Sequence, residues 1–210
     1  MKGHFINCPD PTDCWCEVRR LSRVLWITLA ILIFEIIGAI VSNSLALFAD
    51  AGHVFGDSTA IVVTLLAAVL VRFGAQAKRV RNVAFWINIG LLFLIVIWIV
   101  FEAIKRFENP NEIISSVMIV VAFIGGVGNY WQHHVLEGAA SEHKHHAHRA
   151  LSFHVISDLI QSVVVVIGGI LIWISGWILI DPLLSIGIAC WIVYRTFQLV
   201  FNSYDETDNT

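Results

Sequence analysis

Two histidine–aspartate pairs with the same spacing lie in apolar parts of the chain. The first is His53 with Asp57, in SNSLALFADAGHVFGDS, and the second is His154 with Asp158, in ALSFHVISDLIQSV. Residues four apart on a helix stand one above the other on one face, so each pair would present an imidazole beside a carboxylate. Two such pairs supply two imidazoles and two carboxylates, which is a set that suits a tetrahedral metal ion. The alternative is interhelical hydrogen bonding that only fixes packing.

The rest of the chain makes these charged groups unusual. Its 210 residues are 58% hydrophobic and 14% charged, and the mean hydropathy is +0.79. This composition predicts an integral membrane protein surrounded by lipid, and we expect no nucleic-acid partner. A charged side chain near the bilayer centre costs about 2.5–3.5 kcal/mol on insertion scales, so ionisable residues there are predicted to be functional.

Six apolar runs are each long enough to form a transmembrane helix, which predicts an all-α membrane protein. They cover roughly residues 21–41, 45–71, 83–104, 113–135, 151–174 and 181–201. We therefore expect an N-terminal tail over 1–20, a six-helix transmembrane domain over 21–201 and a short tail over 202–210. Asp181 and Pro182 are predicted to be the N-cap and first residue of the last helix.

The basic residues predict how the spans are oriented. Six spans place both termini on one side, and nearly all basic residues fall on that side: Lys2, Arg19, Arg20, Arg23, Arg72, Lys78, Arg79, Arg81, Lys144, Arg149 and Arg195. Only Lys105 and Arg106 fall on the other side. Since basic residues concentrate on the cytoplasmic side of membrane proteins, both termini are predicted to be cytoplasmic.

Four segments together resemble the cation diffusion facilitators: SNSLALFADAGHVFGD, FEAIKRFENP, ALSFHVISDLIQSV and GWILIDPLLSIGIA. The resemblance covers about residues 21–200. It implies a proton-coupled exporter of divalent transition metals in the bacterial inner membrane, usually a homodimer, and not an enzyme. It places the transport site on His53, Asp57, His154 and Asp158 and favours Zn²⁺, with Cd²⁺, Co²⁺, Fe²⁺ and Mn²⁺ as further candidates.

The chain departs from this family at its C-terminal end. Members usually carry a cytoplasmic domain after the sixth helix, whereas residues 202–210 are all that follows here. We therefore expect a form without that domain, in which membrane helices alone hold the dimer through close packing. The candidate contacts lie on the third span: Gly90, Phe93, Ile97 and Phe101, with Phe85 and Trp86 near its inner end.

Three further polar residues lie within the apolar runs. Asp50, one turn before His53, is either a fifth ligand or relay for ions and protons, or a cap-like group near the helix start. Glu35 is either a pathway residue or a hydrogen-bonded structural acid. Asn129 is interpreted more readily as a residue that stabilises helix packing than as a ligand. The glycines before it predict close helix contacts.

Two peripheral groups of donors could also bind metal. The N-terminal tail contains His4, Cys8, Cys14 and Cys16, and the loop before the fifth span contains His143, His145, His146 and His148. Cytoplasmic thiols stay reduced, so metal capture is a better interpretation of the tail than a disulfide. The histidine run is typical of a metal-collecting tract. The alternatives are a tail with incidental thiols and a solvated loop.

Helix geometry raises one difficulty for the four-ligand site. At a rise of about 1.5 Å per residue, His53 would lie about 13 Å from the outer end of its span and His154 about 5 Å from the inner end of its own. The two would then differ in depth by about 10 Å, which helix tilt or a site displaced toward the cytoplasm would have to remove.

Two other classes of protein could use the same residues. A membrane haem protein could take His53 and His154 as axial ligands, although the carboxylate one turn from each histidine disfavours it. An intramembrane metalloenzyme would normally contain an HExxH pair, which is absent from the spans.

Overall fold

The computed structural model describes residues 15–72, 77–140 and 146–208. Six helices occupy these ranges: α1 (Trp15–Ser42), α2 (Leu45–Arg72), α3 (Ala77–Glu108), α4 (Ser115–Ala140), α5 (His146–Ser175) and α6 (Ile180–Asp208). No strand occurs in the described residues, so the all-α prediction is confirmed. Helix α1 begins before residue 21 and α6 continues past residue 201, so polar helix ends extend beyond the apolar runs.

Four of the helices contain an apolar stretch long enough to cross a membrane. Within the described residues these stretches are Leu25–Ser42, Phe85–Glu108, Asp158–Ser175 and Ile180–Gln198. Helices α2 and α4 contribute the shorter apolar stretches Leu45–Gly56 and Ser115–Trp131. The protein is therefore an all-α membrane protein, and the count of six crossings stays a prediction.

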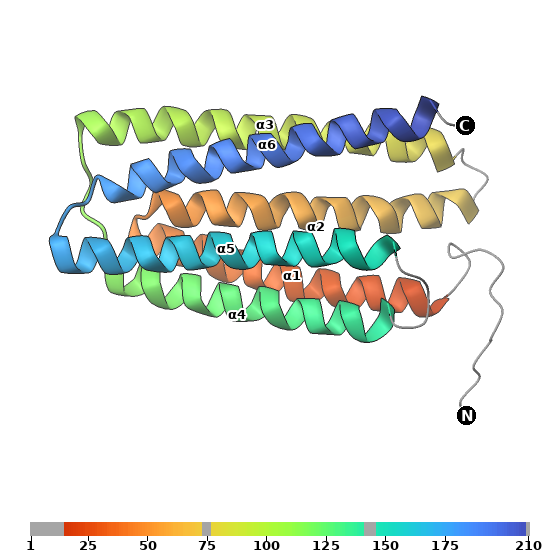
Figure 1. The fold of residues 1–210 in the computed structure, drawn as a ribbon, viewed down its shortest axis with the longest axis horizontal. Helices are drawn as coiled ribbons and strands as arrows, with labels where there is room; N and C mark the ends of the chain where they lie inside the picture. Colours follow the sequence, from red (N-terminus) through yellow and green to blue (C-terminus); the bar gives the residue numbers. More distant parts are fainter. Residues whose placement is uncertain (1–14, 73–76, 141–145, 209–210) are drawn as a thin grey trace.

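The helices form two groups that share α2 (Figure 1). Helices α3 and α6 pack together on one side, α1, α4 and α5 lie on the other, and α2 runs between them and contacts α1, α3, α5 and α6. The start of α1 and the end of α6 lie at one end of the bundle. We call the other end the turn end, where the connections 43–44, 109–114 and 176–179 lie.

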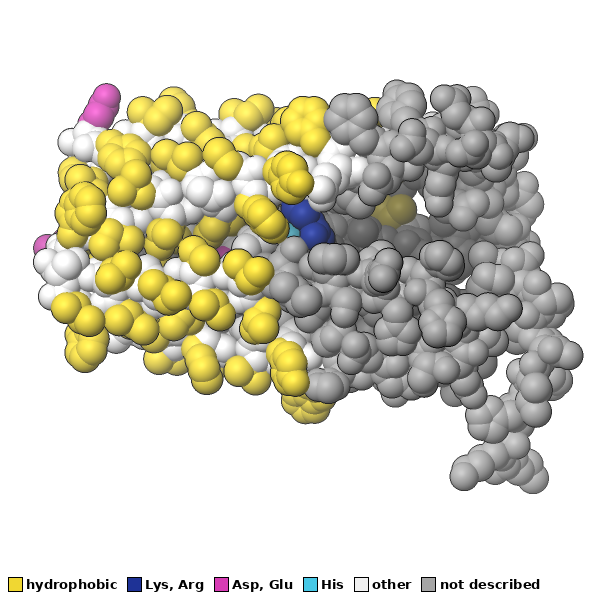
Figure 2. All heavy atoms as spheres, in the orientation of Figure 1, with side chains coloured by type: hydrophobic (Ala, Val, Ile, Leu, Met, Phe, Trp, Pro, Cys, Tyr) yellow, Lys and Arg dark blue, Asp and Glu magenta, His cyan; other side chains and the backbone are white. Residues whose placement is uncertain are grey.

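The outer surface is apolar and the interior contains polar residues. Figure 2 shows hydrophobic side chains over most of the described part of one face, with a His and a Lys or Arg side chain in the hollow between the two rows of helices. Trp173 and Ile174 are 71% and 74% exposed. Such an exterior suits hydrocarbon rather than water.

Glycines allow α4 to approach its neighbours closely, as the sequence predicted. A Cβ atom at Gly126 would lie 3.0 Å from the Cβ of Ser162 on α5, and one at Gly128 would lie 2.8 Å from Cδ1 of Ile31 on α1. A side chain at either position would require the neighbouring residue to move. Small residues at helix interfaces are the usual means of close packing in membranes.

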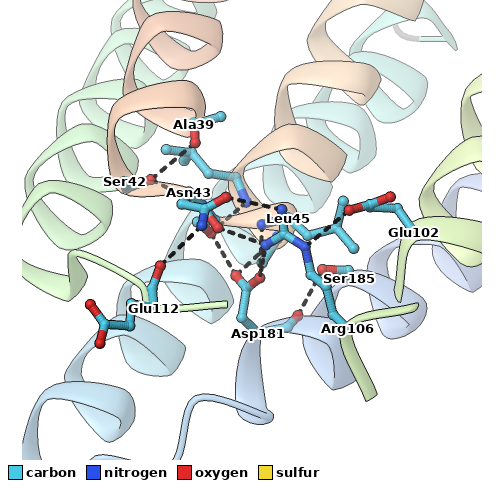
Figure 3. A network of polar contacts seen from close by, with 12 residues as sticks. Ala39, Ser42, Asn43, Leu45, Glu102, Arg106, Glu112, Asp181 and Ser185 are labelled. Carbon is cyan, nitrogen blue, oxygen red and sulfur yellow. Dashed lines mark hydrogen bonds and ion pairs between the residues drawn. The ribbon is translucent and has the colours of Figure 1, made fainter. Parts of the chain in front are cut away.

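A buried carboxylate holds the turn end together (Figure 3). Asp181 on α6 is 0% exposed. Its Oδ1 accepts hydrogen bonds from Ser44 Oγ at 2.6 Å and from the Ala46 amide at 3.1 Å, and its Oδ2 accepts from the Leu45 amide at 2.7 Å. The Leu47 amide donates to Ser44 Oγ at 3.1 Å, which makes Ser44 the N-cap of α2.

The structure thus corrects the predicted role of Asp181. We expected Asp181 to cap its own helix, but α6 already begins at Ile180 and the carboxylate caps the first turn of α2 instead. Two amides of that turn, which have no intrahelical partner, find one in this carboxylate. Sequence spacing could not predict this because the two segments lie more than 130 residues apart, at separations of 136 and 135 residues.

Arg106 on α3 joins the same group. Its Nη1 lies 3.4 Å from Asp181 Oδ2 and donates to the Asn43 carbonyl at 2.6 Å, while Nη2 donates to Asn43 Oδ1 at 3.3 Å. Asn43 has a φ of 55° in the left-handed region, which Asn tolerates better than most residues. Its side-chain Nδ2 donates to the Glu112 carbonyl at 3.1 Å. One charged group therefore connects α2, α3, α6 and two connecting segments.

Replacing Asp181 with alanine should destabilise the protein more than any single change elsewhere at the turn end. Removing one partner of a buried ion pair typically costs about 3–5 kcal/mol because the other charge is left uncompensated. Loss of the N-cap in Ser44→Ala should cost about 1 kcal/mol. Thermal unfolding in detergent, followed by tryptophan fluorescence, measures both.

Glu112→Ala is the matched control, because that side chain is exposed and only its main-chain carbonyl enters the network. The Tm should fall most for Asp181→Ala, less for Ser44→Ala and little for Glu112→Ala. An Asp181→Ala variant as stable as the control would contradict the role assigned to this carboxylate.

Candidate metal site

The two histidine–aspartate pairs meet between α2 and α5. Nε2 of His53 lies 2.8 Å from Oδ1 of Asp158, which are 105 residues apart in the chain. His53 is 7% exposed and Asp158 is half-buried. The contact joins the histidine of the first pair to the aspartate of the second. The sequence analysis predicted that the two pairs share a metal site but did not predict this direct contact.

The register of the two helices also brings the other two positions level. Helices α2 and α5 run in opposite directions (Figure 1). Position 57 lies four residues after His53, and position 154 lies four residues before Asp158. Both are therefore displaced by about 6 Å toward the end of the bundle where the chain termini lie. The side chains of Asp57 and His154 lie outside the described residues, so their part in the site stays a prediction.

The difference in depth is removed by a shift of α5 along the bundle axis. In Figure 1, α5 reaches beyond the start of α2 at the turn end and begins short of the end of α2 at the other. The sequence estimate also took the apolar run as the helix, whereas α5 is helical from His146.

The depth of His53 follows from the cap on α2. Asp181 and Ser44 hold Leu45 and Ala46 in the first turn, and His53 follows eight residues after Leu45, about 12 Å along the axis. Further along α2, Ser58 and Thr59 donate their hydroxyl hydrogens to the Phe55 carbonyl, at 2.8 and 2.9 Å. These hydroxyls are satisfied within their own helix.

Four further polar side chains are buried near this contact. Glu35, Asp50, Gln161 and Ser162 are 0%, 1%, 4% and 2% exposed. Both carboxylate oxygens of Glu35, Oδ2 of Asp50, both amide atoms of Gln161 and Oγ of Ser162 have no hydrogen-bond partner among the described residues. A buried polar group without a partner is costly, so each one requires an explanation.

These findings bear on the alternatives for Glu35 and Asp50, whose part in the ion pathway stays a prediction. Asp50 does not cap α2, because Ser44 and Asp181 do. Glu35 is not a hydrogen-bonded structural acid within the described residues. It lies close enough to Asp50, His53 and Asp158 for their charges to act on it. Asn129 is half-buried on α4.

Gln161 and Ser162 were missed by the sequence analysis. They follow Asp158 by three and four residues, so they share its helix face. Polar residues at this spacing within an apolar run were the signal that could have identified them.

No three His, Cys, Asp or Glu side chains in the described part of the chain form a cluster that could hold a metal. The peripheral donors cannot be assessed. His4, Cys8, Cys14, His143 and His145 lie outside the described residues, and Cys16, His146 and His148 lie on helices where the side chains are not described.

The fold and the site define a membrane protein that buries paired histidine and aspartate side chains between two helices. The family model for the cation efflux transmembrane domain matches residues 21–206, so the chain belongs to this family. The cation diffusion facilitator resemblance is thereby confirmed. The protein is an integral protein of the bacterial inner membrane, and members of this family are in general transporters rather than enzymes.

Curated relatives agree with the family. The zinc transporter ZitB of Yersinia pestis is 36% identical over 197 residues, which cover 90% of this chain and 62% of the relative. The cadmium, cobalt and zinc/H(+)-K(+) antiporter of Bacillus subtilis is 34% identical over 178 residues, 82% of this chain and 57% of the relative. The metal cation efflux system protein CzcD of Cupriavidus metallidurans is 32% identical over 207 residues, which cover 96% of this chain and 63% of the relative. The chain spans less than two thirds of the length of these relatives.

Truncating either member of the contact between α2 and α5 should abolish tight metal binding. Outer partners of a metal site typically contribute about 10–100-fold in affinity, so His53→Ala and Asp158→Ala should each weaken Zn²⁺ binding by about 100-fold or more. Titration calorimetry of the purified protein measures this.

Glu108→Ala, which removes an exposed carboxylate at the end of α3, should bind Zn²⁺ as the parent does. Unchanged Zn²⁺ affinity in both His53→Ala and Asp158→Ala would reduce the contact to a packing interaction.

Proposed function

We propose that the chain exports a divalent transition metal from the cytoplasm in exchange for protons, with Zn²⁺ as its main substrate. The observation that carries the proposal is the contact between His53 and Asp158, which joins the two pairs across α2 and α5 at 2.8 Å. His53, Asp57, His154 and Asp158 would form the metal-binding site. The names of the relatives, which include zinc, cadmium and cobalt, support this choice of cations.

The ligand types leave room for other ions. Imidazole suits Zn²⁺ and its transition-metal neighbours, while two carboxylates admit ions that prefer oxygen. Cd²⁺ and Co²⁺ are therefore further substrates, and Fe²⁺ and Mn²⁺ follow from the carboxylates.

The proposed topology has six spans with both termini in the cytoplasm. The six antiparallel helices and the distribution of basic residues support it. In this orientation the turn end faces the cell exterior. Metal would enter from the end where the chain termini lie and leave through the turn end.

Proton exchange follows from the chemistry of the ligands. A histidine binds metal only when neutral and a carboxylate only when ionised, so protons and metal compete for the same atoms. A histidine with an ordinary pKa of about 6.5 changes its charge within the physiological range. Alternating access to the two sides would make the exchange directional. The Bacillus subtilis relative has H(+) in its name.

The donors outside the membrane helices would gather metal rather than carry it across. The tail histidine and cysteines and the loop histidines fall on the proposed cytoplasmic side, where the substrate begins its path. Haem binding through His53 is disfavoured, because its Nε2 already lies against Asp158.

Zn²⁺ flux should respond to a pH gradient at fixed Zn²⁺ concentration. Protons on the side where metal is released displace Zn²⁺ from histidine, so acidifying that side below about pH 6.5 should accelerate flux, and acidifying the loading side should slow it. Proteoliposomes with an entrapped Zn²⁺ indicator measure both directions.

Asp57→Ala and His154→Ala are the negative controls, because each variant should lack Zn²⁺ flux at every pH. Flux in the parent protein that ignores the direction of the gradient would rule out proton antiport.

We also infer a homodimer held by membrane helices. Helix α3 exposes Phe93, Ile97 and Phe101 at 38%, 63% and 57%, and a Cβ atom at Gly90 would meet nothing within 4 Å. Phe93 also makes an edge-on contact with Phe197 of α6, at 6.3 Å between ring centroids. This face offers an apolar surface with a small residue, which suits close packing between two copies.

Cysteine introduced at Ile97 should cross-link two copies in native membranes under mild oxidation. The control is Ile172→Cys, because Ile172 is 4% exposed and faces the core of its own bundle. The parent protein, with its native cysteines, sets the background. An active transporter with no cross-linking at any exposed position of α3 would favour a monomer or a different interface.

A further inference from the structure

The four buried side chains that carry unpaired polar atoms among the described residues lie on one side of the contact between α2 and α5. Asp50 precedes His53 by three residues on α2, and Gln161 and Ser162 follow Asp158 by three and four on α5. Because the two helices run in opposite directions, both displacements point toward the turn end, by about 4.5–6 Å. Asp50, Gln161 and Ser162 therefore occupy one level, a turn beyond His53 and Asp158.

Glu35 completes this level from α1. A Cβ atom at Gly125 of α4 would collide with Oε1 of Glu35, and one at the adjacent Gly126 would lie 3.0 Å from Ser162. The two glycines thus bring α4 against Glu35 on one side and Ser162 on the other. The charges of Asp50 and Asp158 act on Glu35, which places all of these groups in the interior shared by α1, α2, α4 and α5.

The chemistry of this level differs from that of the first site. Two carboxylates, an amide and a hydroxyl offer oxygen ligands only. Among the residues whose burial the structure describes, Arg106 is the one buried Lys or Arg, and it is paired with Asp181 at the turn end. The charge of His53 acts on both carboxylates, but one imidazole cannot balance two of them, so this level also requires a cation or a proton. A proton would neutralise one carboxylate, whereas a divalent cation with its waters would neutralise both and would bind the carboxylate, amide and hydroxyl oxygens that have no partner among the described residues.

We propose that Glu35, Asp50, Gln161 and Ser162 form a second cation station that holds a partly hydrated divalent ion on its way to the turn end. The inference rests on the proposed export function and adds to it a separate, oxygen-only binding position. Since no three acidic or histidine donors converge in the described residues, the ion keeps several water ligands, as oxygen-bound Mg²⁺ and Mn²⁺ commonly do. A station without nitrogen ligands binds Zn²⁺ more weakly than the first site, which favours onward release.

Mn²⁺ is the probe, because it prefers oxygen ligands and its free form gives a sharp electron paramagnetic resonance signal. The purified full chain is titrated with Mn²⁺ alone, and bound ion is the loss of that signal. The isosteric variant Glu35→Gln with Asp50→Asn should raise the Mn²⁺ dissociation constant of one site about tenfold or more. His53→Ala should retain that site. Glu108→Gln removes an exposed carboxylate and should leave the titration unchanged.

Zn²⁺ transport by the same proteins separates this proposal from the proposed function. The station predicts that the double variant binds Zn²⁺ at the first site within about twofold of the parent but transports it at least about tenfold more slowly. Unchanged Mn²⁺ binding with slowed transport would mean that the carboxylates carry protons, and the station would be wrong. Equal loss of Mn²⁺ in the double variant and His53→Ala would mean a single site. Absence of Zn²⁺ transport in the parent would instead overturn the export function.

Discussion

The capping of α2 by the Asp181 carboxylate is the interaction on which the rest of the structure depends. In a bilayer, the amides at the start of a helix have no water to satisfy them, so a polar partner must come from the protein. Here the partner comes from α6, is neutralised by Arg106 of α3 and holds Leu45 and Ala46. This fixes the start of α2, beyond which α5 extends at the turn end (Figure 1), and it thereby sets the depth at which His53 meets Asp158.

Buried charge is treated in two different ways within one bundle. At the turn end, both carboxylate oxygens of Asp181 accept hydrogen bonds, and the residue is a structural link between helices. One to two turns deeper, Glu35 and Asp50 are just as buried but keep oxygens without partners among the described residues. The contrast separates a carboxylate that holds helices together from carboxylates that we propose are available for a mobile ion.

The helices, the membrane class and the paired His and Asp residues could be predicted from sequence, because apolar length and i,i+4 spacing are local properties. The depth of the site could not, since it depends on the shift of α5 against α2, which contacts across the bundle determine. Asp181 was assigned to its own helix for the same reason, as its partners are 135 to 137 residues away. Gln161 and Ser162 were overlooked because single polar residues in an apolar helix are common packing elements.

The opposed directions of α2 and α5 give the ligand segments an approximate two-fold symmetry. The axis lies across the bundle and exchanges His53 with His154 and Asp57 with Asp158 in chain position, so each level holds one histidine position and one aspartate position. An ion that approaches from either end of the molecule therefore meets the same pair of residue types. The symmetry stops at the flanks, because Glu35, Asp50, Gln161 and Ser162 lie on the turn-end side. A preference for one direction of travel must then arise from these surroundings rather than from the ligands themselves.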